Sequence, residues 1–412
     1  MEDKALYTQI LGLQPPWEIV NIELDLKRER IDVYIEWPYD TDAPCPVCRE
    51  EQKDALCKIH DRRQERVWRH LDTCQMKTYI HCHIPRIKCH HHGIKTIQIE
   101  WADEKVRFTH LFEWLAIQML KSSANRSQTA KILRVSWDEL NRIMSRAVER
   151  GLSRRQNEII QVLGMDEKSF LSGHSYVTVM TDNVRKRVID VAENRDEDAV
   201  DTLWQGLSDE QRKNVQSVCI DFWKAYISGV HRHAPQADIV FDRFHVTKYL
   251  NEAVDKVRKK EHRDLCRRKD NCLAKTKYLW LKNPENWTTK DENRYAVLSK
   301  NQLAVGRAWN RKELFREFWS LTSVEEAEVF FKRWYFSATH SRLKPIIEVA
   351  KMLKRHLDGL LTWIKYQISN GLAEGFNAKI QQIKSIARGF RYFKNYRIAI
   401  LFHLGDLDMI PQ

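Results

Sequence analysis

The chain lacks the features that send a protein into or across a membrane. No apolar run approaches the ~18 residues that span a bilayer, and the first ten residues lack the basic-then-apolar order of a signal peptide. Lipidation motifs and basic amphipathic anchors are also missing. These absences exclude a helical membrane protein, argue against a membrane partner and predict a cytoplasmic protein.

Fixed-period repeats and low-complexity tracts are absent too, so domain boundaries must be taken from changes in residue pattern. The 412 residues suffice for two to four domains with substantial cores.

Positive charge is in excess, because 69 Lys and Arg outnumber 56 Asp and Glu and leave a formal net charge of +13. This balance favours a polyanionic partner, and nucleic acid is favoured over a lipid surface because no membrane anchor is present.

Cysteine is unevenly distributed. Six of the nine cysteines lie in the first quarter of the chain, at positions 45, 48, 57, 74, 82 and 89. In a protein without an export signal, such clustering indicates metal binding before disulfide bonds. Cys45 and Cys48 are two residues apart, and Cys89 and His92 repeat this spacing, which lets both side chains of each pair reach one tetrahedral Zn²⁺. We therefore expect a structural zinc ribbon.

The fourth zinc ligand stays open at this point. Four other side chains could take the place of His92: His60, Cys82, His90 and His91. The alternative to a metal site is a set of reduced cysteines that pack as small hydrophobic side chains. The 40 residues between the two pairs exceed the usual short ribbon and predict one or two inserted β-hairpins.

The residue pattern divides the chain into five segments and predicts a multidomain α+β fold. Residues 1–103 alternate apolar and polar side chains, as in a zinc-binding, β-rich domain. Residues 104–156 are predicted to form a helix-turn-helix DNA-binding domain. Residues 157–242 and 369–412 are predicted to be two parts of a ribonuclease H-like α/β core, which an all-helical insertion at 243–368 interrupts.

The helix-turn-helix prediction depends on a break between two short helices. The stretch SQTAKIL is followed by a turn at Arg134 and Val135, and Ser136 with Glu139 forms a capping box at the start of the second helix. Four polar side chains are expected to be exposed and able to enter a DNA major groove: Arg126, Gln128, Asn141 and Arg142. A plain helix-packing unit is the alternative.

Strands and helices in residues 157–242 follow the order βββαβαβ, which is that of a ribonuclease H-like sheet with its first strand beside its fourth. Asp166 is expected to end the first strand and Asp221 to end the fourth. The two carboxylates would then face each other across neighbouring strands.

A third acidic residue lies in residues 371–390, which are predicted to form an amphipathic helix. One stripe of this helix is apolar: Phe376, Ile380, Ile383 and Ala387. The opposite side is polar: Glu374, Asn377, Gln381, Lys384 and Arg388. The simplest interpretation is that Glu374 is one surface charge on a solvated face.

Taken together, Asp166, Asp221 and Glu374 predict a metal centre. Two unit charges ~4 Å apart repel by about 4 kcal/mol at an effective dielectric constant near 20, so clustered carboxylates need cations. Oxygen ligands select Mg²⁺ or Mn²⁺, and two such ions can activate a water or a 3′-hydroxyl while stabilising the leaving oxygen of a phosphodiester. Basic side chains of the same helix would hold flanking phosphates: Lys379, Lys384 and Arg388.

Over nearly its whole length the chain resembles the DDE transposases of bacterial insertion sequences, specifically the ISL-three family. The resemblance is carried by several motifs, including CPVC at 45–48, HDRRQERVWRHLDTCQ at 60–75, GMDEKSFLSGHSYVTV at 164–179, CIDFWKAY at 219–226 and AEGFNAKIQQIKSIARGFRYF at 373–393. It implies that Asp166, Asp221 and Glu374 are the catalytic acids, and that the CPVC and KCHHHG motifs form the zinc module. Asp242 and His245 match a [C/D]xxH element, which implies a structural brace or an orienter of the catalytic site.

The function that the resemblance implies is transposition. Such a protein binds the terminal inverted repeats of its element, cleaves DNA with Mg²⁺ or Mn²⁺ and joins the ends to target DNA, as a homodimer that pairs two ends within the nucleoid. A retired, DNA-binding regulator is one alternative, but intact acids at all three positions argue against it. A metal-dependent nuclease is another, although it would not need two N-terminal DNA-binding modules.

Overall fold

The computed structural model describes residues 3–411 except 54, 124, 156–157, 172–174 and 368–370. For residues 371–374 it describes the backbone but not the side chains. The chain forms two compact units, Met1–Gly151 with Asp408–Gln412 and Leu152–Leu407. Within the described residues no helix is both long and apolar enough to cross a membrane.

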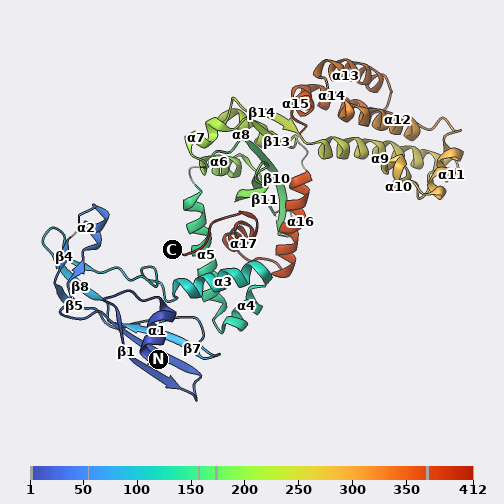
Figure 1. Cartoon of the computed structure of the whole chain (residues 1–412). Helices are drawn as coiled ribbons and strands as arrows, with labels where there is room; N and C mark the ends of the chain where they lie inside the picture. The colour runs from blue at the N-terminus through green and yellow to red at the C-terminus, as the bar shows by residue number, and fades with distance from the viewer. Residues whose placement is uncertain are drawn as a thin grey trace. The chain divides into compact units, whose positions relative to one another are not determined.

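The first unit begins with the helix α1 (Asp3–Leu11) and a four-stranded sheet of order β1-β2-β7-β6 (Figure 1). Its strands are β1 (Glu18–Asp25), β2 (Arg30–Glu36), β7 (Lys77–Cys82) and β6 (Arg66–Arg69). Apolar and polar residues alternate along β2, as expected for a strand with one face on the core. Ile31, Val33 and Ile35 are buried, while the residues between them are partly exposed. Trp17 and Trp68 both pack edge-on against Trp101 in the core.

A second group of short strands follows in the same unit. It comprises β3 (Ala43–Pro44) paired with β4 (Leu56–Cys57), and the sheet β5-β8-β9 formed by β5 (Ile59–Arg62), β8 (Pro85–Cys89) and β9 (Gly93–Thr96). The short helix α2 (Pro46–Glu50) lies between β3 and β4 in the chain. The prediction that strands are inserted between the two Cys/His pairs is confirmed, since β4 to β7 all lie there.

Three helices follow the strands of the first unit: α3 (His110–Ser123), α4 (Arg126–Leu133) and α5 (Trp137–Arg154), whose last three residues belong to the second unit. Arg134 ends α4 in the left-handed conformation, with φ of 54°. The predicted capping box is present, because Ser136 N donates to Glu139 Oε2 at 2.9 Å and Glu139 N donates to Ser136 Oγ at 3.2 Å. The helix, turn and helix therefore occur where the sequence predicts them.

The second unit is built on a five-stranded sheet of order β12-β11-β10-β13-β14 (Figure 1). Its strands are β10 (Val162–Leu171), β11 (Ser175–Asp182), β12 (Arg187–Glu193), β13 (Ser217–Ile220) and β14 (Asp238–Phe241). The first three are antiparallel, whereas β13 runs parallel to both β10 and β14. The prediction that the first strand of this sheet lies beside the fourth is confirmed.

Helices cover this sheet. The helices α6 (Glu197–Gln205), α7 (Asp209–Asn214) and α8 (Lys224–His233) connect β12, β13 and β14. Near the end of the chain, α15 (Leu357–Tyr366) packs on β14, α16 (Gly371–Ile386) on β10 and α17 (Phe393–Leu404) on β12. The α15 contact needs a glycine, because a Cβ at Gly359 would overlap the ring of Phe241.

Between β14 and α15 the chain is helical, although the segment predicted as the insertion, 243–368, also includes α15, which packs on the sheet. The part between them contains α9 (Arg243–Arg267), α10 (Lys277–Leu281), η1 (Pro284–Asn286), α11 (Thr289–Leu298), α12 (Ala304–Arg316), η2 (Glu317–Ser320), α13 (Val324–Thr339) and α14 (Lys344–Arg355). Both α12 and α14 pack along the long α9, and aromatic side chains such as Trp280, Trp309 and Trp334 fill the space between the helices. Because α9 begins directly after β14, its first turn lies at the end of the sheet.

Candidate active site and zinc centre

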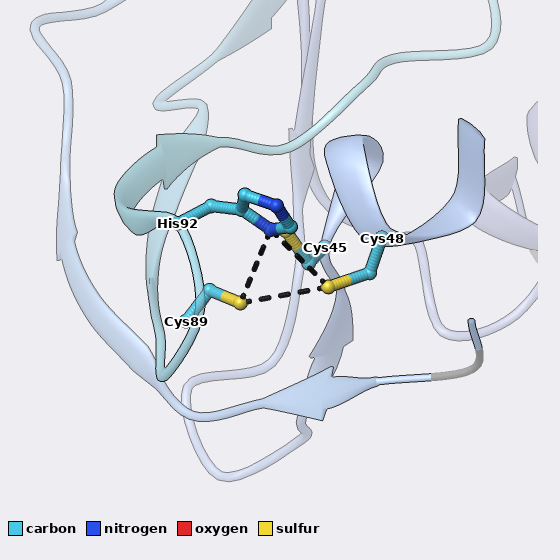
Figure 2. Close-up of side chains that lie close together, drawn as sticks. All are labelled: Cys45, Cys48, Cys89 and His92. Carbon is cyan, nitrogen blue, oxygen red and sulfur yellow. Dashed lines mark hydrogen bonds between the residues drawn. The ribbon is translucent and has the colours of Figure 1, made fainter. Parts of the chain in front are cut away.

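Four side chains of the first unit converge on one point, as Figure 2 shows. Cys45 precedes α2 and Cys48 lies within it, while Cys89 ends β8 and His92 lies in the turn before β9. The Nδ1 atom of His92 is 3.3 Å from Cys48 Sγ and 3.8 Å from the Sγ atoms of Cys45 and Cys89. Cys48 Sγ is 3.6 Å from Cys89 Sγ, and the four ligand atoms all lie within 4.8 Å of one another.

These distances fit Zn²⁺. Tetrahedral zinc, with Zn–S near 2.3 Å and Zn–N near 2.0 Å, separates its ligand atoms by roughly 3.5–3.8 Å. Among the described residues, His92 rather than His60, His90 or His91 joins the three cysteines, so the fourth ligand is the one that the spacing predicts. Cys82 lies outside the group, and burial raises the pKa of its thiol to about 12, as for a cysteine packed as a small hydrophobic side chain.

The cysteines of the site differ in how readily they lose the proton that a bound cation would displace. Burial raises the pKa of the Cys48 thiol to about 12. Burial also acts to raise the pKa of Cys89, but backbone amides of His91 and His92 donate to its sulfur and hold that pKa at about 6. Glu51 Oε1 lies 3.3 Å from His92 Nε2, the nitrogen that faces away from the cysteines. Such a carboxylate orients a metal-binding imidazole.

The second cluster lies in the sheet of the second unit and follows from strand register. Gly164 of β10 pairs with Cys219 of β13, so two residues further along the strands Asp166 comes level with Asp221. In the same way Ile220 pairs with Phe241 of β14, and the next step brings Asp221 level with Asp242. Asp166 within β10 therefore lies in a row with Asp221 and Asp242, the residues that directly follow the neighbouring strands β13 and β14.

One detail of this arrangement differs from the prediction. Asp166 does not end the first strand, because β10 continues to Leu171. The reason is that β10 pairs with β11 along almost its whole length, whereas β13 is only four residues long and stops beside the middle of β10. Asp166 is thus held by regular pairing with Val179 of β11 on one side, and on the other side it lies just beyond the end of β13.

Each aspartate is oriented by hydrogen bonds. Asp166 Oδ2 accepts a 2.6 Å bond from Asn377 Nδ2 of α16, and its Oδ1 accepts from the amide of Glu167 at 2.8 Å. Asp221 Oδ1 accepts from the amide of Trp223 at 2.8 Å. The role of Asn377 was not predicted, although it shares the polar stripe of its helix with Glu374.

Asp242 is held by the start of the insertion. It caps α9 by accepting from the amide of Phe244 at 2.9 Å, and His245 Nε2 lies 3.8 Å from its Oδ2. Because β14 stops at Phe241 and α9 starts at Arg243, this capping residue also marks the junction between sheet and insertion.

The electrostatics of the row favour a bound cation. Burial raises the pKa of both Asp166 and Asp221. Hydrogen bonds oppose this rise in the pKa, from Asn377 and the Glu167 amide at Asp166 and from the Trp223 amide at Asp221, and His245 opposes it at both. Neighbouring carboxylates add to the rise, Asp242 at Asp166 and both Glu167 and Asp166 at Asp221. Within the part of the chain that the structure describes, neither Asp166 nor Asp221 pairs with a lysine or arginine. Oxygen ligands of this kind suit Mg²⁺ or Mn²⁺.

The chain matches models of a known protein family. A family model described as "Transposase", that of the ISL3 group with DDE chemistry, matches residues 163–400. The chain belongs to the ISL3 family of transposases. Two further models of this family match the N-terminal part, a zinc finger at residues 42–92 and a helix-turn-helix domain at residues 97–148. The expected fold class and the resemblance to the ISL-three family are confirmed.

Individual relatives agree with the family. The chain is 26% identical over 356 residues to the transposase for insertion sequence element IS1557 of Mycobacterium tuberculosis, in two strains, and the match covers 79% of this chain and 78% of the relative. It is 25% identical over 372 residues to the transposase for insertion sequence element IS1001 of Bordetella parapertussis, with 87% of this chain and 91% of the relative covered. The zinc-finger match coincides with the Cys₃His cluster, which is the zinc site of the ribbon in this ISL3 transposase.

The predicted third acid, Glu374, lies in α16, but its side chain is outside the described residues. Further along α16, Phe376, Ile380 and Ile383 are buried as the stripe predicts. The predicted extension of this helix to residue 390 is wrong, because α16 ends at Ile386. Arg388 and Gly389 have positive φ angles of 55° and 94° and turn the chain away, which leaves Ala387 exposed.

The basic residues of this segment therefore differ in position. Lys379 is exposed on α16, while Lys384 Nζ donates to the carbonyl oxygen of Ser169 on β10 at 3.3 Å. Arg388 is exposed but lies beyond the helix rather than on it.

In the helix-turn-helix of this ISL3 transposase, two of the four predicted DNA-binding residues are not exposed. Arg126 and Asn141 are half-buried, and Arg126 Nη1 donates to Asn141 Oδ1 at 2.8 Å between α4 and α5. Burial lowers the pKa of the Arg126 guanidinium to about 10. Gln128 and Arg142 are exposed, as expected. The helical period could not reveal that the first pair bond to each other.

Proposed function

We propose that this protein cuts DNA at the ends of its insertion sequence and joins the freed 3′-hydroxyls to target DNA, with Asp166, Asp221 and Glu374 as the catalytic acids. The observation that carries the proposal is the register that brings Asp166 level with Asp221 on neighbouring strands. Membership of the ISL3 transposase family supports it, since the matching model spans both aspartates and position 374. The period of α16 supports the third acid, because Glu374 precedes Asn377 by about one helical turn in the sequence.

The carboxylates would hold two Mg²⁺ or Mn²⁺ ions. When bound, such ions lower the pKa of a water or 3′-hydroxyl and stabilise the leaving oxygen. The chain's own residues orient the ligands: Asn377 and the amide of Glu167 each occupy one oxygen of Asp166, and the amide of Trp223 holds Asp221. Asp242 and His245 brace the end of the sheet beside them. In-line phosphoryl transfer by this site needs no covalent bond between protein and DNA.

Recognition of the terminal inverted repeats falls to the first unit. Gln128 and Arg142 are the exposed polar residues of the helix-turn-helix that we assign to base or phosphate contacts. Lys379, Lys384 and Arg388 are assigned to phosphates that flank the cut. Two ends must be paired before they are joined, so the active form is proposed to be a homodimer on double-stranded DNA.

The experiment incubates the purified protein with a duplex that carries one end of the element and its flanking DNA, together with a target plasmid and Mg²⁺. Strand transfer supports the proposal. Binding without cleavage would support a DNA-binding regulator, and cleavage without joining would support a nuclease.

Matched variants assign the site. Asp166→Asn, Asp221→Asn and Glu374→Gln should each abolish cleavage and leave DNA binding intact. Asp209→Asn is the control, because Asp209 is an exposed carboxylate on α7, outside the proposed site. Cleavage by Glu374→Gln at the normal rate would remove Glu374 from the assignment.

A further inference from the structure

A cavity of about 310 Å³ lies beside the row of aspartates and has no role in the proposed chemistry. Its volume is at the lower end of the range for ligand pockets, about 300–1,000 Å³. It is lined by residues from one strand and two connections of the sheet: Tyr176, Asn194, Arg195, Asp196 and Trp223. Tyr176 is the second residue of β11, the next three residues follow β12, and Trp223 follows β13.

Aromatic side chains and one guanidinium form the walls. The Cζ atom of Arg195 lies 4.3 Å from the centre of the Tyr176 ring and 4.6 Å from that of Trp223. The indole of Trp223 is fixed in orientation, because its Nε1 donates to the carbonyl oxygen of Arg195 at 2.8 Å. Trp223 nevertheless remains 41% exposed, which leaves aromatic surface open to a ligand.

The cavity is tied to the proposed catalytic residues at two points. The amide of Trp223 donates to Asp221, so the aromatic residue is two positions from a catalytic acid. Arg195 Nη1 is 2.7 Å from Oε2 of Glu167, which directly follows Asp166 and points to the opposite face of β10. The link to the site therefore runs through Trp223, and a group stacked on its ring would lie beside Asp221 at the end of β13.

The charge of the lining favours a neutral, planar ligand over a phosphate. Arg195 is the basic side chain among the described lining residues, and it is already paired with Glu167. Asp196 adds a negative charge, although its Oδ1 accepts from the amide of Ala199 at the start of α6. An anion would thus meet little net positive charge, whereas an aromatic base could stack on Trp223 and receive hydrogen bonds from Asn194 or Arg195.

We propose that Trp223, with Tyr176 and Arg195, forms a stacking site for one unpaired nucleobase of the DNA next to the cut. This inference rests on the proposed function, because only a protein that cuts DNA has a base next to the cut. Stacking compensates the cost of taking a base out of the duplex, and this places the neighbouring phosphodiester at the aspartates.

A protein–DNA double-mutant cycle tests the proposal. The substrates are duplexes of the element end, each with a single abasic site at one nucleotide near the cut. Trp223→Ala should lower the single-turnover cleavage rate of intact DNA by roughly 5- to 150-fold, the range for loss of one stacked base. Trp223→Phe should retain most of the rate. On the one substrate that lacks the stacked base, wild type and Trp223→Ala should cleave at the same rate.

Phe336→Ala on α13 is the matched control, because Phe336 is a 65% exposed aromatic residue of the insertion. It should leave cleavage unchanged on every substrate. The proposal is overturned if Trp223→Ala cleaves intact DNA at the wild-type rate. It is also overturned if, at every abasic position, Trp223→Ala lowers the cleavage rate by the same factor as on intact DNA, because the two changes would then act independently. Should Trp223→Ala not fold, Trp223→Leu keeps the apolar volume without a ring and enters the same cycle.

A binding measurement separates this inference from the proposed function. Without divalent metal, the wild type should bind a duplex with one extrahelical base near the cut more tightly than a fully paired duplex, and Trp223→Ala should lose this preference. If the wild type cuts no DNA yet shows the preference, the proposed function fails and the stacking site stands. Cutting without any preference in the wild type overturns the stacking site alone.

Discussion

Asn377 of α16 donates a 2.6 Å hydrogen bond to Oδ2 of Asp166 on β10, although 211 residues separate the two in sequence. This bond joins the C-terminal segment of the core to the sheet at the residue proposed as its first catalytic acid. A carboxylate that binds a metal is oriented by such hydrogen bonds, because they fix the plane in which its two oxygens present their remaining lone pairs.

We expect Asn377→Ala to weaken metal binding more than DNA binding. Loss of a hydrogen bond to a metal-binding carboxylate typically costs 10- to 100-fold in metal affinity. The Mg²⁺ concentration that gives half-maximal cleavage should therefore rise by about 10-fold or more. Single-turnover cleavage across a Mg²⁺ titration measures this. Gln381→Ala, an exposed residue on the same helix, is the control and should keep the normal requirement. An unchanged Mg²⁺ requirement in Asn377→Ala would show that the bond is only structural.

The zinc site makes a second prediction. Elemental analysis should find roughly one Zn²⁺ per chain, and Cys45→Ser should lose the metal and unfold the segment around it, because structural zinc supplies folding free energy. Circular dichroism and thermal melting follow the unfolding. Cys74→Ser is the control, since Cys74 is exposed and outside the ligand group. Retention of zinc by Cys45→Ser would exclude this ligand set.

A third prediction separates the two arginines of the helix-turn-helix. Arg142→Ala should weaken DNA binding and reduce the slope of log affinity against log salt by about 0.9, the value for one phosphate contact. Arg126→Ala should leave that slope unchanged and lower the melting temperature, because Arg126 is half-buried and bonded to Asn141. Fluorescence anisotropy at several salt concentrations measures the first effect. The opposite result for the pair would restore Arg126 as the DNA contact.

A fourth prediction concerns acid stability of the first unit. Burial, with the neighbouring charge of Arg69, lowers the pKa of His70 to about 4. The unfolded chain takes up this proton below about pH 6.5, so the stability is present above that pH and falls as the pH is lowered toward the folded pKa. The loss from His70 should be about 2 kcal/mol between about pH 6.5 and 5.

Urea unfolding at the two pH values measures this loss. His70→Gln should show a smaller pH dependence than the wild type by that amount, and His83→Gln, at an exposed position, should not. Both variants keep the zinc ligands, so their comparison isolates His70. Equal pH dependence in wild type and His70→Gln would contradict the assigned protonation.

Much of the fold was accessible from the sequence because its signals are local. Apolar and polar residues alternate within the seven residues 30–36, and the capping box joins residues only three apart, Ser136 and Glu139. The strands that carry or precede Asp166 and Asp221 are likewise each indicated by a short run of residues. The spacing of Cys45 with Cys48 and of Cys89 with His92 is local as well. Assignment of Glu374 to the catalytic site stays a prediction, since its side chain lies outside the described residues.

The errors share one cause. The sequence pattern misplaces the end of β10 because the length of this strand is set by pairing with β11. It predicts an exposed Arg126 because the partner of this residue, Asn141, lies on the next helix. The helical period predicts a helix to residue 390, beyond its end at Ile386, because it does not reveal the positive φ angles of Arg388 and Gly389.

By itself, the sequence determined the types of element, the four zinc ligands as the favoured set and the two aspartates that end up level with each other. Only the tertiary structure decided that Asn377 holds Asp166, that His92 completes the zinc site and that Trp223, Arg195 and Tyr176 surround one cavity. The physical reason is range: propensity and spacing act over one or two turns of chain, whereas these contacts form only when segments tens to hundreds of residues apart pack together.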